Sequence, residues 1–381
     1  MKPQLFFSLL VLLTVLSCSR HSSSEDNVPI ICFDEFSDIH SAETMITSFL
    51  KLSTTDNCLI SSLSQLISTK DLLLIADGKK VLVFDKKGSF ITQIGQKGEG
   101  PGEYLYPVSF FIQEEENIIH IIDMNNKVLR FSLNTFQFIS EKKMAFASSY
   151  ASFLPDGNII WTNRGYLSKE IHSESYFLVT DTNFTVLNNF VDKEFKSGYT
   201  TGDQNNIYNI GKQLFIYTPF SPVIYQASTD SLFPVFKLSV EKRKFPPTDF
   251  LQEITADGMP YFPKLENSDY ISHFGLRENT HDVCVFYIAK GERFIGLYDK
   301  VKKQTYHYRI SDFQQWLNIG AGFTYVVSGM LDDYHVIPLT PSELKEQKRN
   351  GYQFPMSLDS LIDKSREDDN PILCLFKIKT I

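Results

Sequence analysis

The chain has 381 residues, of which 37 are basic and 45 are acidic, so its formal net charge at pH 7 is −8. This length suits two ordinary domains or one large all-β domain, so the hydrophobic pattern has to decide between them. An acidic chain without a dense basic stripe lacks the electrostatic footprint of nucleic-acid binding, and we expect no nucleic-acid partner.

The first residues have the pattern of an export signal. A basic residue precedes an unbroken apolar run, Leu5 to Leu16, which ends at Ser17 and Cys18. The run is too short to span a bilayer, and its flanks are those of a removable signal. A small residue followed by cysteine is the cleavage pattern of a bacterial lipoprotein, so we expect residues 1–17 to be removed and Cys18 to carry lipid.

Residues 18–27 are expected to be a flexible tether, because they are polar and have no periodic pattern. As a random coil, the stretch after Cys18 spans roughly 15–18 Å. We therefore expect a single domain, residues 28–381, held close to a membrane of the cell envelope by its lipid anchor only. The outer membrane is the favoured location, and either of its faces is compatible with the sequence.

Short β-type runs separated by turn signals dominate the chain from about Met45 onward. The runs 72–75, 81–84 and 90–94 are joined by tight turns at Asp77-Gly78 and Lys87-Gly88. The run 59–67 supplies a fourth strand ahead of them. These runs predict one antiparallel four-stranded unit.

The same scheme returns in the next stretch of the chain. Asp77 recurs as Asp123, 46 residues later, and Phe84 recurs as Phe131. A repeat of this length, with each copy a four-stranded antiparallel sheet, is typical of a propeller blade. The strands expected for this second unit are 108–112, 118–122, 128–131 and 136–139.

Four looser units follow, at 151–190, 207–240, 270–310 and 323–378. Dividing residues 57–381 gives about 54 residues per blade for six blades or about 46 for seven, and the insertions favour six. The sequence therefore predicts an all-β six-bladed β-propeller of four-stranded antiparallel blades. Ile46 to Leu52 is a strand-like run left over before the first blade, and we expect it to pair with Ile372 to Ile378 and close the ring.

One insertion near the C-terminus has the pattern of a helix. Thr340 is an N-cap residue, Pro341 stands at the first helical position and Glu343 at the third. Gly351 follows a basic end, as at a helix stop. We expect this short helix to decorate a blade.

The segment from Gly95 to Pro107, followed by a strand and Asp123, resembles the repeat of NHL-type β-propellers. With the cysteine pattern at Cys18 and the terminal segment 369–373, the chain is similar to the six-bladed β-propeller lipoproteins of the Bacteroides type. This resemblance is strongest over residues 45–140. It implies a fold and an envelope location without an agreed chemistry, because a fold does not name a function.

The glycine-rich part of that segment suits a crossover between blades. Its glycines can take positive φ or a close backbone approach, and its proline stiffens the path. A phosphate-cradling loop is the alternative, which we reject because no Lys-Ser/Thr or helix start follows and the glutamates would repel an anion. The residues assigned to the crossover are Gly98, Gly100, Pro101, Gly102 and Glu103.

The searched catalytic signatures, a G-x-S-x-G elbow and an H-E-x-x-H helix, do not occur in the sequence. The nearest calcium-like cluster, 123–126, lacks the downstream Gly and Glu of an EF-hand loop and is interpreted as a β-turn. We expect no metal and no cofactor. The candidates for ligand binding at the central funnel are Arg164, Tyr166, His273 and Arg277, with packing or surface scatter as the alternative for each.

Four cysteines remain after Cys18. None forms a C-x-x-C pair, which argues against zinc. An exported protein can form disulfides, but spacing does not assign them, and we favour buried thiols. These residues are Cys32, Cys58, Cys284 and Cys374.

We interpret the chain as a non-enzymatic, membrane-anchored binding or scaffold protein that uses one face of the propeller to hold a ligand, an envelope protein, a peptide or a glycan. The alternative is a propeller enzyme, a lyase or hydrolase acting on glycan or peptide. A funnel metal, or a His-Arg-Glu/Asp group within hydrogen-bond reach, would favour the enzyme. A wide aromatic mouth would favour binding.

Overall fold

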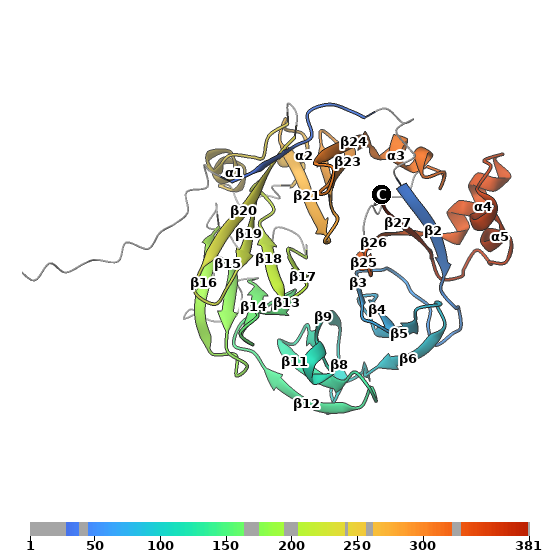
Figure 1. The fold of residues 1–381 in the computed structure, drawn as a ribbon. Coiled ribbons are helices and arrows are strands. Elements are labelled where there is room, and N and C mark those ends of the chain that lie inside the picture. Colours follow the sequence, from blue (N-terminus) through green and yellow to red (C-terminus); the bar gives the residue numbers. More distant parts are fainter. Residues whose placement is uncertain are drawn as a thin grey trace, which may run out of the picture.

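The computed structural model describes residues 28–37, 45–163, 175–193, 205–240, 243–256, 262–321 and 329–379. In these residues the strands form six blades of four antiparallel strands around a central axis (Figure 1). The first strand of each blade lies nearest the axis. The all-β, six-bladed prediction is confirmed.

The first three blades follow one another along the chain. Blade 1 consists of β3 (Gln65–Ser68), β4 (Leu72–Ala76), β5 (Val81–Asp85) and β6 (Phe90–Ile94). Blade 2 consists of β9 (Pro107–Gln113), β10 (Ile118–Asp123), β11 (Lys127–Ser132) and β12 (Phe138–Lys143). Blade 3 consists of β13 (Ala151–Phe153), β14 (Ile159–Thr162), β15 (Ser175–Thr180) and β16 (Val186–Asp192).

The other three blades use both ends of the chain. Blade 4 consists of β17 (Ile207–Ile210), β18 (Gln213–Tyr217), β19 (Val223–Ala227) and β20 (Leu232–Ser239). Blade 5 consists of β21 (Ile271–Glu278), β22 (Asp282–Ala289), β23 (Glu292–Asp299) and β24 (Gln304–Arg309). Blade 6 consists of β25 (Gly329–Leu331), β26 (Tyr334–Leu339), β27 (Ile372–Ile378) and β2 (Met45–Lys51).

Some predicted strand boundaries were wrong. The expected strand 59–67 begins only at Gln65, because the residues before it form the crossover from blade 6. The expected strand 136–139 begins at Phe138, because Phe136 takes a positive φ of 57° in the preceding turn. The expected segment 323–327 lies outside the described residues.

Each blade interface contains its own cluster of buried apolar side chains. The reason is that both faces of a blade pack on neighbours, so a central strand such as β5 buries its first four residues completely. In β15, for example, Leu178 belongs to the cluster between blades 2 and 3, whereas Val179 belongs to the cluster between blades 3 and 4. The core is therefore a ring of interfaces.

The two ends of the chain close this ring in blade 6. β2 pairs with β27 in antiparallel register over seven residue pairs, from Met45 opposite Ile378 to Lys51 opposite Ile372. Figure 1 shows the two strands side by side. The predicted closure is confirmed. The inner strands of blades 6 and 1 also meet, because Gly329 of β25 pairs with Leu66 of β3.

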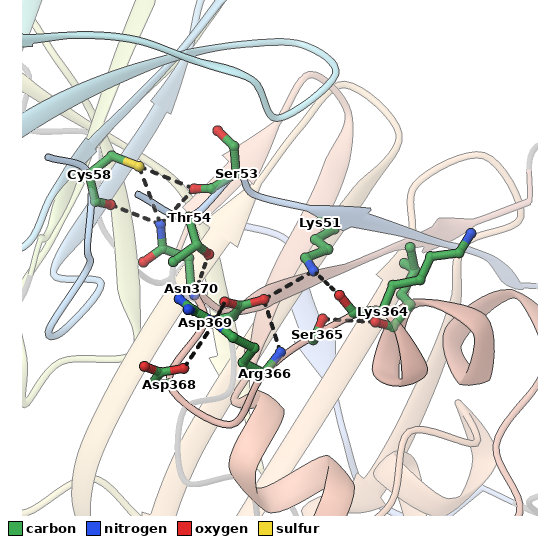
Figure 2. A network of polar contacts seen from close by, with 11 residues as sticks. Lys51, Ser53, Thr54, Cys58, Lys364, Ser365, Arg366, Asp368, Asp369 and Asn370 are labelled. Atoms are coloured by element: carbon green, nitrogen blue, oxygen red, sulfur yellow. Dashed lines mark hydrogen bonds and ion pairs between the residues drawn. The ribbon is translucent and has the colours of Figure 1, made fainter. Parts of the chain in front are cut away.

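Asn370 reinforces the closure from within (Figure 2). Its side chain is buried, and its Nδ2 donates to the carbonyl oxygens of Ser53 and Cys58, at 2.8 Å each. Its Oδ1 accepts from the amide of Ile60 at 2.7 Å. One amide therefore satisfies three backbone groups of the crossover that leads from blade 6 into blade 1.

An ion pair next to Asn370 ties β2 to the segment before β27. Lys51 Nζ lies 3.1 Å from Asp369 Oδ2 and donates to the carbonyl of Lys364 at 2.8 Å (Figure 2). Arg366 Nε contacts the other carboxylate oxygen of Asp369 at 3.2 Å. Burial acts to raise the pKa of Asp369, but the backbone amide of Arg366 first, and then the side chains of Lys51 and Arg366, hold it below its usual value.

The N-terminal segment forms a strap across two further blades, which the sequence did not predict. Its first strand, β1 (Ile30–Cys32), adds to the outer edge of blade 4 in parallel with β20. The chain then pairs with β24 of blade 5, where Ser37 donates its amide to the carbonyl of His307 at 2.8 Å. β2 follows in blade 6, so the strap contacts blades 4, 5 and 6 in turn (Figure 1).

Phe33 anchors the strap in a notch of blade 5. Its side chain is 1% exposed, and a Cβ added to Gly296 of β23 would lie 2.6 Å from its ring. Glycine is therefore required inside this strand, where it otherwise weakens pairing. Phe36 stacks on the His307 ring with centroids 4.6 Å apart.

Five α-helices occur in the described residues: α1 (Thr248–Thr255), α2 (Phe262–Glu266), α3 (Ile310–Trp316), α4 (Pro341–Arg349) and α5 (Met356–Asp363). The expected C-terminal helix is α4, with Pro341 at its start and Gly351 at a positive φ just beyond it. The side chain of Thr340 makes no cap hydrogen bond, so the expected capping box does not form. The other four helices were not predicted from the sequence.

We predict that Phe33→Ala destabilises the propeller by about 3–5 kcal/mol, the usual cost of removing a fully buried phenylalanine. Urea unfolding of the full chain measures this change. Ile30→Ala is the matched control, because that strap residue is 62% exposed and loses little on truncation. Equal unfolding free energies for the two variants would contradict an anchoring role for Phe33.

Candidate functional site

The two ends of the propeller differ in their connections. Two kinds of connection lie at one end of the propeller, which we call the turn end. They are the turn from the first to the second strand of a blade and the turn from the third to the fourth. In the described residues these connections have two to five residues. Connections between the second and third strands, and between blades, share the opposite end, which we call the crossover end.

The long connections all belong to the crossover end. They include 240–270, which contains α1 and α2, and 310–328, which contains α3. The longest, 340–371, contains α4 and α5, which lie on the outer side of blade 6 (Figure 1). Because long connections on a rigid scaffold are where binding residues concentrate, the crossover end is the candidate site.

Exposed apolar side chains follow the same division. In the described residues, six large exposed apolar side chains belong to connections and not to the strap or the outer strands. Five of them belong to connections of the crossover end, and one, Val301, belongs to a connection of the turn end. The five are Leu59, Tyr106, Met124, Phe262 and Met356. Tyr106 and Met124 are neighbours, because the Met124 amide donates to the Tyr106 carbonyl at 3.0 Å. Lys97 Nζ lies 5.1 Å from the centre of the Tyr106 ring.

The turn end is held together by polar contacts between blades. Lys212 of blade 4 pairs with Glu115 of blade 2 at 2.8 Å, and Lys86 of blade 1 pairs with Asp332 of blade 6 at 2.6 Å. Asn279 of blade 5 donates to the carbonyl of Asp333 of blade 6 at 3.0 Å. Exposed ion pairs of this kind add little stability.

The glycine-rich segment is a crossover, as predicted, and leads from blade 1 to blade 2. Within it, β7 (Gln96–Lys97) pairs in parallel with β8 (Glu103–Tyr104). Glu103 Oε2 accepts from the Gly100 amide at 2.8 Å, and Oε1 accepts from Gln96 Nε2 at 2.6 Å. These hydrogen bonds, the one from Gly100 first, lower the pKa of Glu103.

Glu103 also explains the glycines and the failure of the phosphate alternative. A Cβ at Gly98 would collide with its carboxylate, and a Cβ at Gly102, where φ is 77°, would lie 2.9 Å from the Phe138 ring. The carboxylate already takes the backbone N–H that a phosphate would need. An anion there would meet a negative charge in place of free donors.

The repeated aspartates accept hydrogen bonds from the backbone of a turn and of a crossover. Asp123 Oδ1 accepts from the amides of Leu105 and Tyr106 at 3.0 Å each. Asp77 Oδ1 accepts from the amides of Lys79 and Lys80 at 2.9 Å each. The interpretation of 123–126 as a turn therefore agrees with the structure.

Of the predicted ligand-binding residues, Arg164 and Tyr166 lie outside the described residues, as does Cys18. His273 and Arg277 both belong to β21, on the same side of the strand. Burial lowers the pKa of His273, and Arg293 lowers it further. Arg277 Nη1 donates to two carbonyls, those of Leu276 at 2.7 Å and Asn205 at 3.4 Å.

A polar group that the sequence did not single out connects blades 4 and 5. Tyr208 Oη donates to Glu278 Oε2 at 2.5 Å, and Lys300 Nζ lies 2.6 Å from Glu278 Oε1. Burial raises the pKa of Tyr208, and the Glu278 charge adds to this. Glu278 is thus committed to two partners within the protein. The sequence does not indicate that these residues meet. Glu278 and Lys300 are 22 positions apart, and Tyr208 belongs to a different blade.

No group of three or more His, Cys, Asp and Glu side chains in the described residues could hold a metal ion. None of the helices described is long and apolar enough to cross a membrane. Cys58, Cys284 and Cys374 are buried free thiols as expected, and burial raises the pKa of Cys284 and Cys374. Cys32 is exposed on the strap, so its predicted burial was wrong.

Comparisons with known proteins agree with this architecture. The family model described as "6-bladed beta-propeller" matches residues 19–338. A crystal structure of a Bacteroides fragilis protein described as exported has 40% sequence identity and a TM-score of 0.88, covering 92% of this chain and 100% of that one. None of the curated proteins compared with the chain matches it.

Two further solved structures are similar at low identity. BamB from Moraxella catarrhalis has 11% identity and a TM-score of 0.38, over 76% of this chain and 72% of that one. The Pan2 WD40 domain of Neurospora crassa has 9% identity and a TM-score of 0.37, over 72% of this chain and 71% of that one. At these scores neither bears on function.

We predict that Glu103→Ala lowers the unfolding stability of the chain, because the partly buried Gly100 amide loses its acceptor. Chemical unfolding of the full chain measures the loss. Glu99→Ala removes a neighbouring glutamate of the same crossover and is the control. A loss no greater than that of the control would show that the carboxylate does not hold the crossover.

Proposed function

Because this chain belongs to the 6-bladed beta-propeller family, we propose that it is an exported, lipid-anchored binding protein that captures an envelope partner with its crossover end. The observation that supports the proposal is the asymmetry between the two ends. One end has short turns joined by polar contacts, and the other has the long connections and most of the exposed apolar side chains of the connections. Loops held by a rigid scaffold are a common form of binding surface.

Tyr106 and Met124 are the proposed anchors of that surface. They are 41% and 57% exposed and adjacent, and Lys97 adds a charge beside the Tyr106 ring. Aromatic and methionine side chains are enriched in protein interfaces, where a few of them dominate the binding energy. The crossover that presents Tyr106 is fixed by Glu103 and Asp123, so little ordering is required on binding.

The location proposed is the cell envelope, with lipid on Cys18. The apolar run that ends at Ser17-Cys18 supports it, as does the similarity to a protein described as exported. The strap begins at blade 4, so the anchor would join the propeller at its outer edge. A diacylated or triacylated cysteine would hold the protein on a membrane, which a single chain does not do stably.

We predict that the membrane-extracted protein begins at Cys18 and has acyl mass added. Intact-mass spectrometry before and after alkaline ester hydrolysis measures both properties. Cys18→Ser is expected to leave the signal uncleaved and to remove the acyl mass. A wild-type chain that begins at another residue, or at Cys18 without added mass, would contradict lipid anchoring.

We predict that the double variant Tyr106→Ala/Met124→Ala lowers capture of the envelope partner about tenfold or more, as for loss of hot-spot side chains of ~2 kcal/mol. The measurement is quantitative pull-down from solubilised envelopes, with partners identified by mass spectrometry in the wild type and followed across variants. Val301→Ala, at the turn end, is the matched control, because that side chain is 64% exposed. Retention of the same partners by the double variant would contradict binding through these anchors.

A further inference from the structure

The strap packs on a buried histidine of blade 5. His307 of β24 is 1% exposed, and its backbone forms two hydrogen bonds with Ser37. Its carbonyl accepts from the Ser37 amide at 2.8 Å, and its amide donates to Ser37 Oγ at 3.0 Å. The Phe36 ring stacks on the imidazole with centroids 4.6 Å apart, and the centroid of the Phe33 ring lies at 6.0 Å. The strap therefore covers this imidazole directly.

The other neighbours of the imidazole leave no place for a second proton. Tyr287 Oη lies 2.8 Å from Nε2, and the Phe294 ring lies 6.1 Å away, centre to centre. Nδ1 is buried and has no hydrogen-bond partner among the described residues. A protonated imidazole has an N–H on both nitrogens, so protonation in this position would bury a charged donor that has no acceptor.

The charged groups around this cluster also oppose a positive charge on His307. The Arg243 guanidinium lies 4.2 Å from the centre of the Phe294 ring. The Arg309 guanidinium lies 5.5 Å from the centre of the Phe36 ring. No carboxylate bonds to the imidazole in the part of the chain that the structure describes. The acidic groups and the thiol on these elements are exposed: Glu292, which pairs with Arg309 at 3.7 Å, and Cys32, Asp34 and Glu35 of the strap.

These surroundings couple the protonation of His307 to the position of the strap. Burial first, and then the charge of Arg243, lower the pKa of His307 from its ordinary 6.5 to about 4. Release of the strap removes part of the cover, so the pKa rises toward its ordinary value. The docked state then binds fewer protons than the released state. Docking is strongest above about pH 6.5, weakens as the pH falls, and levels off below about pH 4.

Few contacts hold the strap, so it can open while the blades stay folded. β1 pairs with β20 over three residues. Ile30 and Phe36 are 62% and 43% exposed, and the buried apolar side chains of the strap are those of Ile31 and Phe33. Segments with few buried apolar contacts open at a lower free-energy cost than the core of a protein.

We propose that the contact between the strap and His307 is an acid-sensitive latch, which releases residues 28–37 from blades 4 and 5 when the imidazole is protonated. Release would uncover the outer edge of β20 and the notch at Gly296. An uncovered edge strand can pair with another extended segment, so the latch would control access to blade 4. The proposal does not depend on the proposed function, because it involves neither Tyr106 nor Met124.

The test is amide hydrogen exchange of the full chain at pH 7 and at pH 5, measured by mass spectrometry and corrected for the intrinsic pH dependence of exchange. In the wild type, the protection of residues 30–37 is expected to fall about tenfold or more between the two pH values, as the difference in pKa allows. The protection of β10 in blade 2 is expected to stay the same, because the opening is local.

Two variants remove the titration of the latch. His307→Gln is expected to abolish the pH dependence, because a carboxamide does not titrate but can still bond to Tyr287 Oη. His307→Phe is the second variant, because a phenyl ring keeps the stacking with Phe36 if glutamine loosens the strap at both pH values. In each variant the protection of residues 30–37 at pH 5 is expected to equal that at pH 7.

His120→Gln is the matched control. His120 is 6% exposed in blade 2, which the strap does not contact, and it stacks on Phe111 with centroids 4.6–4.8 Å apart, at 4.7 Å. Burial, and then the charge of Arg130, lower its pKa to about 3. This variant also removes a buried histidine, but it is expected to keep the pH dependence of the strap.

Equal protection of the strap at both pH values in the wild type would overturn the proposal. A pH dependence that both His307 variants retain would also overturn it, because the dependence would then belong to other groups such as Asp34 or Glu35. The same holds for a dependence that His120→Gln removes. A parallel loss of protection in β10 would show that the whole propeller opens, in place of a latch.

Discussion

The seven residue pairs between β2 and β27 hold the two ends of the chain together, and the ring of blades depends on them. Each blade buries both faces against its neighbours, so an open ring would expose two apolar sheet faces as well as unpaired strand edges. Asn370 and the ion pair of Lys51 with Asp369 strengthen this one interface from within. The remaining blades follow one another along the chain and need no such device.

The N-terminal segment contacts three of the six blades. β1 adds to blade 4, Phe33 fills the notch at Gly296 in blade 5, and β2 completes blade 6. Residues 28–37 are therefore part of the folded domain, and at their start the strap pairs with the outer edge of blade 4 over three residues.

The two ends of the propeller differ in the length of their connections. The turn end has connections of only two to five residues in the described part of the chain, which leave little freedom. The crossover end contains the long connections and most of the exposed apolar side chains of the connections. Long connections held by a rigid scaffold are where binding residues concentrate.

The sequence by itself determined the features that depend on neighbours along the chain. Alternating apolar runs and tight turns gave the blades, the run before blade 1 gave the closing strand, and Pro341 with Gly351 marked α4. The spacing of glycines around Glu103 identified the crossover, because the backbone conformation and close contacts at those positions require glycine. Strands, turns and helix ends of this kind can be predicted from the sequence, because the residues that determine each of them lie within a few positions along the chain.

Only the tertiary structure decided which distant residues meet. The parallel pairing of β1 with β20, the fit of Phe33 against Gly296 and the group of Tyr208, Glu278 and Lys300 join different blades or a blade and the strap. The same holds for Asn370, which is an ordinary polar residue in the sequence and bonds three backbone groups of a distant segment in the closed ring. The physical reason is that pairing and burial across an interface depend on how the blades pack, and a polar residue's own neighbours in the chain carry no record of that packing.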